Sequence, residues 1–456
     1  MIKKTLALAI GLAGTKLAMA QGFYVDEQSA LRLGDAFSGG AAQADDASTA
    51  FYNPAGLTRL KATQLTLNLS AVSVQSEFKG GSTIFDGTTL GGASVQGKKV
   101  SADALDILPS IYFSTPMSEN MVFGAYVNAP YATGTDFGGN SVGRYFATES
   151  SITGIDFGTA LGFKVSDNLS FGISMVMQYL SATVAQNLNT SAACLGAEAQ
   201  LAPFTCAGLG ITSVGDTTYD SPFEMKGDDF NIGFTAGMLY EFSPESRLGL
   251  HYRNLISHDI QGKAKLEVPA SAETFGSLAG FVDTNAKGTV TLETPSQANL
   301  SFYQGLGKFS VQADVQWTQW SSFETLSIKS NDPVIKSVAG PQTYDWVDSY
   351  RYAIGGSYQV SPALTLRSGF ALDKTPIKDS QTKLDFAFDD YQAISFGLTY
   401  AIDQDLAFDF GIQKTLKQKR SLNQGDITDP AQNLSKLDGD VTTDVLSVAA
   451  GIKMKF

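Results

Sequence analysis

The sequence has few of the residues on which enzymes and metal centres depend. It contains two histidines, His251 and His258, and two cysteines, Cys194 and Cys206, among 456 residues. It also lacks long hydrophobic runs, since no segment after the first twenty residues reaches the roughly 18 apolar residues of a membrane-spanning helix. We therefore expect no catalytic residues, no metal, no cofactor and no bundle of membrane helices.

The charge balance is a second constraint. Asp and Glu number 45 against 32 Lys and Arg, and the formal net charge is −13 at pH 7. A protein that neutralises the phosphates of nucleic acid needs the opposite balance. Nucleic acid is therefore not expected as a partner.

Residues 1–20 predict a secretory signal peptide. Lys3 and Lys4 form a basic start, residues 6–12 are apolar, and Ala18-Met19-Ala20 has the pattern of a cleavage site. An N-terminal membrane anchor is the alternative, but the apolar run is too short to span a bilayer. The mature chain is expected to begin at Gln21, outside the cytoplasm.

From residue 62 onward the sequence alternates with the period of β-strands. Within 230–242, for example, Phe230 and Phe234 share one face, whereas Asn231 and Thr235 belong to the other. Fourteen segments of this kind are predicted, at 64–78, 105–115, 121–130, 152–165, 168–186, 229–242, 246–257, 288–305, 308–320, 349–360, 363–373, 391–402, 405–416 and 444–456.

The connections and the end of the chain indicate a closed barrel. Short turns such as 166–168 alternate with long polar loops such as 187–228, as on the two rims of an outer-membrane barrel. The last segment alternates up to a terminal Phe456, which is typical of such barrels. A soluble sandwich or propeller is the alternative, but no blade-like repeat is present. The sequence predicts an all-β transmembrane protein, a 14-stranded antiparallel outer-membrane β-barrel over residues 62–456.

Residues 21–61 predict an N-terminal hatch, or plug, inside the lumen. They are rich in small residues, have no strand period, and contain the rigid step Asn53-Pro54-Ala55. Fourteen strands enclose a bore between the filled interior of about eight strands and the water channel of about sixteen. Because an open bore of that size would leak small solutes, gated uptake is favoured over general diffusion.

Asn128, Ala129, Pro130 and Tyr131 end the third predicted strand. Proline cannot donate a hydrogen bond to the sheet and is confined to edges and bulges. Pro130 therefore marks either the loop boundary or a local gap in the wall, and the sequence alone favours the boundary.

Cys194 and Cys206 share the longest predicted loop, in an oxidising compartment. We expect them to form a disulfide that closes a small loop.

The plug sequence GFYVDEQSALRLGDAFSGGAAQADDAST (22–49), followed by Asn53-Pro54-Ala55, resembles the hatch of the FadL-type outer-membrane transporters of long-chain fatty acids and other hydrophobic compounds. The likeness continues through 231–253, 317–326 and 348–376. It implies a hatch-filled barrel, capture of ligand between extracellular loops and a lateral exit at a kink in the third strand, at residues 128–131. It also implies that the amino end enters the ligand pocket, where Phe23 stands at the matching aromatic position.

The sequence departs from the family where a ligand carboxylate would bind. Positions that are basic in fatty-acid members correspond to Gln186 and Gln342. Arg253, Arg351 and Arg367 face the lumen by the alternation and could supply the missing cation. Alternatively, they pair with lumenal carboxylates to brace barrel and hatch. The ligand would then be neutral, such as an aromatic or aliphatic hydrocarbon.

We therefore predict passive uptake of hydrophobic molecules, above all long-chain fatty acids, by a monomer in the bacterial outer membrane that contacts outer-membrane lipid and lipopolysaccharide. Neutral hydrocarbons are the alternative cargo, and a surface adhesin or receptor anchored by the barrel is the alternative function. Phage could exploit the loops as a receptor. An enzyme built on His251, His258 and Ser257 is disfavoured, because such a site depends on a geometry that a lone strand histidine seldom provides.

Overall fold

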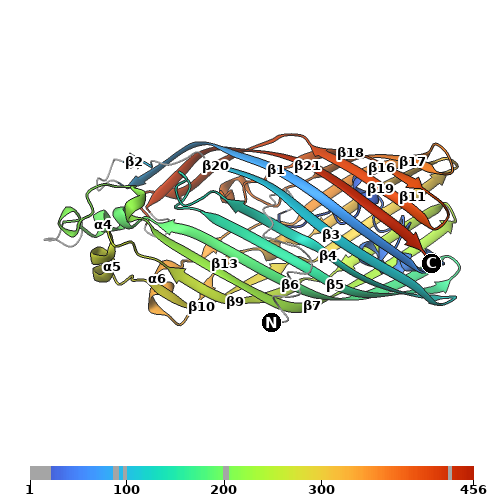
Figure 1. Ribbon diagram of the computed structural model, residues 1–456, viewed down its shortest axis with the longest axis horizontal. Coiled ribbons are helices and arrows are strands. Elements are labelled where there is room, and N and C mark those ends of the chain that lie inside the picture. The colour runs from blue at the N-terminus through green and yellow to red at the C-terminus, as the bar shows by residue number, and fades with distance from the viewer. Residues whose placement is uncertain (1–21, 86–91, 96–99, 199–204, 430–433) are drawn as a thin grey trace.

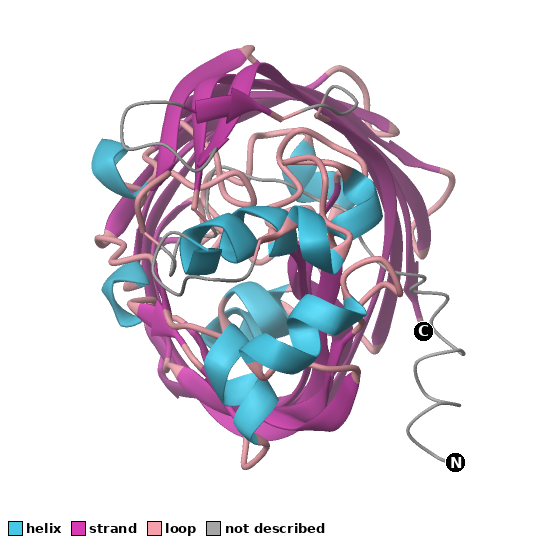
Figure 2. Ribbon diagram, turned by 90° about the vertical axis from the view of Figure 1, so that its left-hand side faces the viewer, coloured by secondary structure: helices cyan, strands magenta, loops and turns pink. Residues whose placement is uncertain are grey.

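The computed structural model describes residues 22–85, 92–95, 100–198, 205–429 and 434–456. Antiparallel strands run along one long axis (Figure 1), and a view along that axis shows that they close into a ring (Figure 2). The first long strand, β1 (Gln64–Phe85), completes the ring by pairing with the last, β21 (Ser435–Lys455). Closure leaves no exposed sheet edge at this seam.

Within the described residues the wall is a 14-stranded antiparallel barrel, as the alternation predicts. Eleven of its strands are unbroken: β1, β3 (Ser101–Ser118), β4 (Met121–Asp136), β5 (Glu149–Ser166), β6 (Leu169–Leu188), β7 (Ser221–Ser243), β12 (Phe309–Thr318), β16 (Ser349–Gln359), β17 (Leu364–Asp373), β18 (Tyr391–Ala401) and β21. Three others are each split into two segments: β8 (Ser246–Arg253) with β9 (Ile256–Leu266), β10 (Thr284–Thr294) with β11 (Gln297–Leu306), and β19 (Leu406–Thr415) with β20 (Gln418–Asp426).

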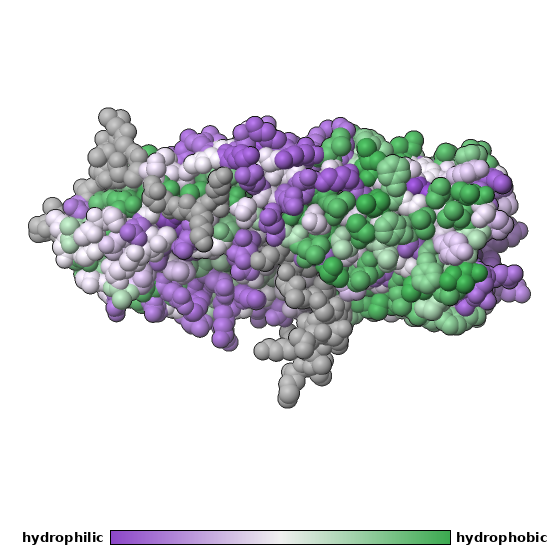
Figure 3. Space-filling view, turned by 45° about the horizontal axis from the view of Figure 1, so that its top comes forward, coloured by the Kyte–Doolittle hydropathy of each residue, from purple (hydrophilic) through white to green (hydrophobic). Residues whose placement is uncertain are grey.

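Apolar side chains cover the outside of the wall over one half of the barrel. On β7, Phe234 is 59% exposed whereas Thr235 is 4% exposed, so the apolar residue points outward. The visible face in Figure 3 is hydrophobic at one end and hydrophilic at the other. An apolar outer band with a polar interior is the arrangement that a barrel needs in a membrane.

The strands continue beyond the predicted segments at the hydrophilic end. β7 begins at Ser221 rather than at 229, and β21 begins at Ser435 rather than at 444, so parts of the predicted long loops are strand. The alternation of hydrophobicity ends there because both faces of the wall meet polar surroundings. Backbone pairing does not depend on that alternation and continues.

The segment 22–60, called the plug below, is packed inside the ring. It contains α2 (Ala30–Leu33), α3 (Thr49–Tyr52) and the 3₁₀ helix η1 (Pro54–Arg59), and almost all of it is buried. This position fits the predicted hatch. The predicted signal peptide, residues 1–20, lies outside the described residues, and the boundary between residues 61 and 62 remains a prediction.

Glycines in the wall allow the plug to lie directly on the strands. A Cβ atom at Gly249 would be 1.9 Å from the carbonyl oxygen of Ala41, and one at Gly172 would be 2.3 Å from the nitrogen of Ala55. A larger residue at either position would displace the plug backbone.

The hydrophilic end carries short elements between the strands, and none of the described helices has both the length and the hydropathy needed to cross a membrane. These elements are β2 (Gly92–Ser94), α4 (Thr190–Glu198), η2 (Ala207–Leu209), η3 (Thr217–Tyr219), α5 (Glu273–Ala279), η4 (Trp320–Ser322), β13 (Thr325–Leu326), β14 (Ile328–Lys329), α6 (Pro333–Val338), β15 (Gln342–Thr343) and η5 (Asp379–Gln381).

Candidate functional site

An aromatic cluster surrounds the start of the plug. Phe23 is fully buried, and its ring centroid lies 4.7 Å from Trp320, 5.6 Å from Phe323 and 5.9 Å from Tyr131. Trp346 packs on the same ring at 6.4 Å. Phe23 therefore anchors the amino end of the plug in an apolar environment that residues of η4, β4 and the loop before β16 build around it.

A cavity adjoins this cluster on the side of the hydrophilic end. Its volume is about 50 Å³, so its lining side chains lie close together. Most of its lining is apolar: Ile152, Ala182, Val184, Met225, Ile260, Val290, Leu292, Leu326, Ile328 and Phe386, with Ser150, Thr183, Gly340, Gln342 and Tyr344. Several of these residues belong to the same buried cluster as Phe23. The cavity lining and the aromatic cluster therefore belong to one continuous packing of apolar side chains.

A cation stands at the edge of the cavity. Lys383 donates from Nζ to Oε1 of Gln342 at 3.1 Å, and its Nζ lies 4.3 Å from the ring centroid of Tyr344. Among the described residues no carboxylate is within ion-pair distance of Lys383. Asp385, two residues further along the loop, accepts a hydrogen bond from the hydroxyl of Tyr344 at 3.0 Å. Burial lowers the pKa of the Lys383 ammonium, and burial raises the pKa of Asp385.

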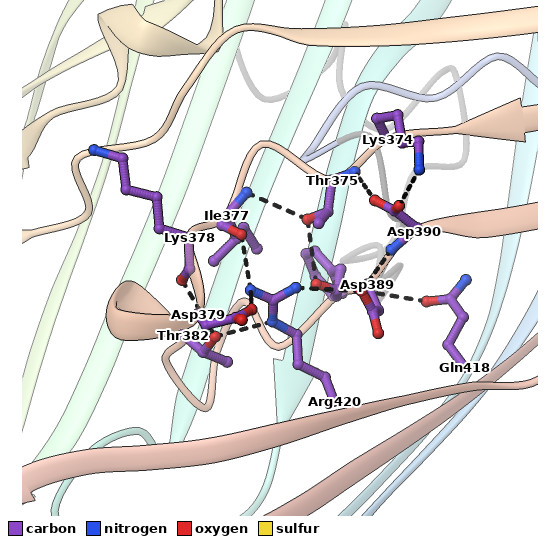
Figure 4. Close-up of polar contacts among 11 residues, drawn as sticks. Lys374, Thr375, Ile377, Lys378, Asp379, Thr382, Asp389, Asp390, Gln418 and Arg420 are labelled. Atoms are coloured by element: carbon purple, nitrogen blue, oxygen red, sulfur yellow. Dashed lines mark hydrogen bonds and ion pairs between the residues drawn. The ribbon is translucent and has the colours of Figure 1, made fainter.

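The loop 374–390, which carries Lys383, is fixed to β20 by one arginine (Figure 4). Arg420 donates to Thr382 Oγ1 at 2.9 Å and to the carbonyl oxygen of Ile377 at 2.7 Å. It also contacts Asp379 at 3.0 Å and Asp389 at 3.3 Å. These contacts hold the loop, and with it the rim of the cavity, in one position.

The wall has a break beside the plug. β3 and β4 pair only from Ser118 and Met121 up to Ile111 and Val127. Beyond that point β4 bulges. Asn128 is opposite Asp156 of β5 and Tyr131 is opposite Gly154, so β4 has one more residue than β5 between these two pairs. The strand then continues to Asp136, so the loop boundary that the sequence favoured for Pro130 is wrong. Pro130 lies inside a strand, at a gap between two strands.

The amino end of the plug occupies this break. Val25 donates its backbone N–H to the carbonyl of Pro130 at 2.9 Å, and Ala132 donates to the carbonyl of Phe23 at 2.9 Å. The plug residues 23–25 thus pair with β4 where β3 does not. Nothing in the sequence near Val25 signals this pairing, since the segment has no strand period.

Gln28 completes the closure. Its Nε2 donates to the carbonyl of Ala129 at 2.9 Å, and its Oε1 accepts from the N–H of Ala129 at 3.1 Å. Its own carbonyl accepts hydrogen bonds from Ser110 at 2.7 Å and Tyr112 at 2.9 Å, both on β3. One glutamine therefore joins the two strands that the break separates, a role that the sequence analysis did not identify.

Asn53, Pro54 and Ala55 lie away from the cavity, against the wall. Nδ2 of Asn53 donates to the carbonyl oxygens of Ala41 at 2.6 Å and of Met238 at 3.0 Å, and its Oδ1 caps η1 by accepting from Ala55 at 3.0 Å. Pro54 is the first residue of that helix. This motif attaches the plug to the barrel.

The three predicted lumenal arginines are buried or half-buried and contact protein partners. Arg253 pairs with Asp156 at 2.5 Å. Arg351 pairs with Asp26 at 3.1 Å and donates to the carbonyl of Ala36 at 2.5 Å. Arg367 donates to Thr399 at 2.5 Å. The cavity lining includes none of the three.

The remaining candidates lie apart from the cavity. Cys194 and Cys206 form a disulfide with Cα atoms 6.0 Å apart. The ring of His258 contacts Asp229 and Gln178, both at 3.1 Å, while Ser257 is exposed on the opposite face of the strand. No group of three metal-binding side chains occurs in the described part of the chain.

Comparison with known proteins gives one consistent result. Residues 11–456 match a family described as outer membrane protein transport protein (OMPP1/FadL/TodX). The long-chain fatty acid transport protein of Escherichia coli O6:H1 is 27% identical over 409 residues, which are 88% of this chain and 87% of that protein.

Solved structures of outer-membrane transporters share the fold, and two of them illustrate the range of similarity. A Pseudomonas aeruginosa FadL homologue gives a TM-score of 0.82 at 23% identity and covers 95% of this chain and 100% of its own. The Ralstonia pickettii toluene transporter TbuX gives 0.64 at 18% identity, with 96% and 99% covered.

Proposed function

Since this chain belongs to the outer membrane protein transport protein family (OMPP1/FadL/TodX), we propose that it carries hydrophobic molecules, long-chain fatty acids first, passively into the cell. Membership makes it an outer-membrane β-barrel transporter of hydrophobic compounds and not an enzyme. The cargo, the route and the residues that serve it are the proposal. We take the transporter to act as a monomer.

The proposed route begins at the loops and ends in the wall. A hydrophobic molecule enters the cavity at the hydrophilic end and reaches the aromatic cluster around Phe23. Displacement of Phe23 then withdraws Val25 and Gln28 from Pro130 and Ala129, and the break between β3 and β4 opens. The outward residues of β3 beside the break, Ile107 and Ile111, are apolar and exposed, so the molecule would pass directly into the lipid.

The observation that carries the choice of cargo is Lys383 at the edge of an apolar cavity, with no carboxylate within ion-pair distance among the described residues. Asp385 attracts the Lys383 charge from a longer distance. A ligand carboxylate would form the charge-assisted hydrogen bond that Asp385 does not form. Lys383 contacts Gln342, which the resemblance matches to a basic position of the family, so Lys383 would place a positive charge near the same point from a different loop. We assign to Lys383 the binding of the fatty-acid carboxylate. The role that we assign to Arg253, Arg351 and Arg367 is to stabilise the wall and the plug.

Two further donors favour a ligand that contains oxygen. The indole N–H groups of Trp320 and Trp346 are buried and have no hydrogen-bond acceptor among the described residues. An unpaired buried donor costs free energy, and a ligand oxygen would satisfy it. Neutral hydrocarbons remain the second candidate, because the cavity lining itself is uncharged.

The test measures binding of oleate and of toluene to the purified barrel. Lys383→Gln should weaken oleate roughly 10- to 150-fold, as expected for loss of a charged hydrogen bond worth about 1.5–3 kcal/mol. It should leave toluene affinity unchanged. Lys378→Gln is the matched control, since Lys378 lies in the same loop but pairs with Asp345 at 2.8 Å. Unchanged oleate affinity in Lys383→Gln would refute the assigned anchor, and toluene binding without oleate binding would make hydrocarbons the cargo.

A further inference from the structure

Three lysines form a straight row on the outside of the barrel. Lys226 on β7 is directly opposite Lys263 on β9, which is directly opposite Lys287 on β10. All three side chains are exposed. Neighbouring strands are about 4.8 Å apart, so three positive charges lie within roughly 10 Å. Like charges directly opposite each other destabilise a sheet unless an anion compensates them.

The row is distinguished by three adjacent lysines that all lack an ion-pair partner among the described residues. The nearest carboxylates in register are Glu224 and Asp228, each two residues along β7, about 7 Å away along the strand. Six other exposed lysines of the described chain have a carboxylate within 4.0 Å: Lys79 with Glu77, Lys265 with Glu267, Lys374 with Asp390, Lys378 with Asp345, Lys414 with Asp444, and Lys419 with Asp440. In a chain with a net charge of −13, three adjacent lysines outside ion pairs are a local excess of positive charge.

A surface hollow lies over the row. Its charged lining consists of Lys226, Lys263, the adjacent Lys265 and the two carboxylates Glu224 and Asp228, and its polar lining of Tyr179, Ser181, Gln261 and Asn285, while Lys287 lies beside it. Gly227 and Gly262, which face each other across the two strands, contribute no side chain to it. Three ammonium groups against two carboxylates leave the hollow with an excess of positive charge, and its hydroxyl and amide groups can hydrogen-bond to a phosphorylated sugar.

The height of the row relative to the apolar band identifies the occupant. Tyr179 and Phe230 pack against each other on the outer surface with tilted rings whose centroids are 4.8 Å apart, next to the exposed apolar residues Met177 and Ile232. Aromatic residues in this position mark the membrane interface. Lys226 is four residues beyond Phe230, which is about 13 Å along the strand and about 9 Å in height at a tilt near 45°. This is the level of lipid headgroups.

We propose that Lys226, Lys263 and Lys287 bind the phosphates of a lipid A-type glycolipid of the outer leaflet, with its sugars in the hollow and its acyl chains against the apolar band. The row faces outward from the barrel, so the site is separate from the transport route and does not depend on the identity of the cargo. Such a lipid would offset the mutual repulsion of the lysines and hold β7, β9 and β10 in one orientation toward the membrane.

The experiment measures lipid A binding to the full-length barrel in detergent, by native mass spectrometry. Bisphosphorylated lipid A should bind to the natural protein at least about tenfold more tightly than to the triple variant Lys226→Gln/Lys263→Gln/Lys287→Gln. The control triple Lys374→Gln/Lys414→Gln/Lys419→Gln removes the same charge from paired lysines and should bind as the natural protein does. Dephosphorylated lipid A should bind weakly to all three proteins.

The proposal fails if the row variant keeps its affinity, if the control loses as much, or if dephosphorylated lipid A binds as tightly as the phosphorylated form. Heat-modifiable migration of each variant on gels reports whether the barrel is folded. If the triple variant does not fold, the single variant Lys263→Gln, at the centre of the row, decides the question, and at least a threefold loss of affinity is expected.

Discussion

Replacing Gln28 with leucine should loosen the closure of the wall without changing the cavity. Leucine has a similar size but can neither donate to the carbonyl of Ala129 nor accept from its N–H, which the glutamine does at 2.9 Å and 3.1 Å. Both groups of Ala129 belong to the stretch of β4 that has no partner on β3. The closed state therefore loses two hydrogen bonds that no neighbouring strand can replace.

The size of the effect follows from these two bonds. Each net hydrogen bond contributes about 0.5–1.5 kcal/mol, so the closed state loses about 1–3 kcal/mol relative to the open one. Since about 1.4 kcal/mol is a factor of ten, the ratio of open to closed forms should rise roughly 5- to 150-fold. The bonds from Val25 to Pro130 and from Ala132 to Phe23 remain, so the closed form should still predominate.

Two measurements check this prediction. Hydrogen exchange of the peptide that contains Ala129 should accelerate by the same factor, and transfer of a fluorescent fatty acid from the reconstituted barrel into the surrounding bilayer should become faster. Gln43→Leu is the matched control, because Gln43 contacts Arg32 and Asp45 within the plug and does not touch the break. Faster transfer with unchanged exchange at Ala129 would refute the reasoning, since the molecule would then leave by another path.

Three other changes test neighbouring parts of the route. Pro130→Val adds a backbone N–H to residue 130 of β4, whose carbonyl already accepts a hydrogen bond from Val25. Uptake should fall about two- to tenfold while ligand binding stays intact. An equal loss of uptake and binding would argue against the lateral exit. Arg420→Ala removes the contacts that hold the loop 374–390 and should weaken oleate binding about tenfold, as measured by calorimetry. Lys419→Ala on the same strand is the control, and equal oleate affinities of the two variants would exclude the loop from the site. Oleate affinity should fall as pH rises, because deprotonation of Lys383 removes the cation while the ligand carboxylate stays ionised. The fall should start below the usual lysine pKa of about 10.4, since burial lowers the pKa of Lys383. Lys383→Arg should shift that fall to higher pH, and an unchanged pH profile in this variant would contradict the role of Lys383.

Individual residues show how far the sequence could predict the site. Phe23 and the Asn53-Pro54-Ala55 step could be singled out because the motif that contains them is local. Pro130 could be recognised as an anomaly, but its effect could not, since the strand that fails to pair with it is determined by register. Lys383 escaped notice because it lies about forty residues from Gln342 in the chain and meets it only through the folding of two loops.

The sequence by itself determined the barrel, its fourteen strands and its place in a membrane, because strand alternation, turn length and export signals are local properties that each segment carries independently. Only the tertiary structure decided where two neighbouring strands fail to pair, which plug residues fill that break, and which charged side chain lies at the edge of the cavity. Each of these depends on contacts between residues that are distant in sequence: Gln28 with Ala129, Arg420 with the loop 374–390, and Lys226 with Lys263 and Lys287. Such contacts follow from strand register and loop packing, on which a hydrophobic period of two carries no information.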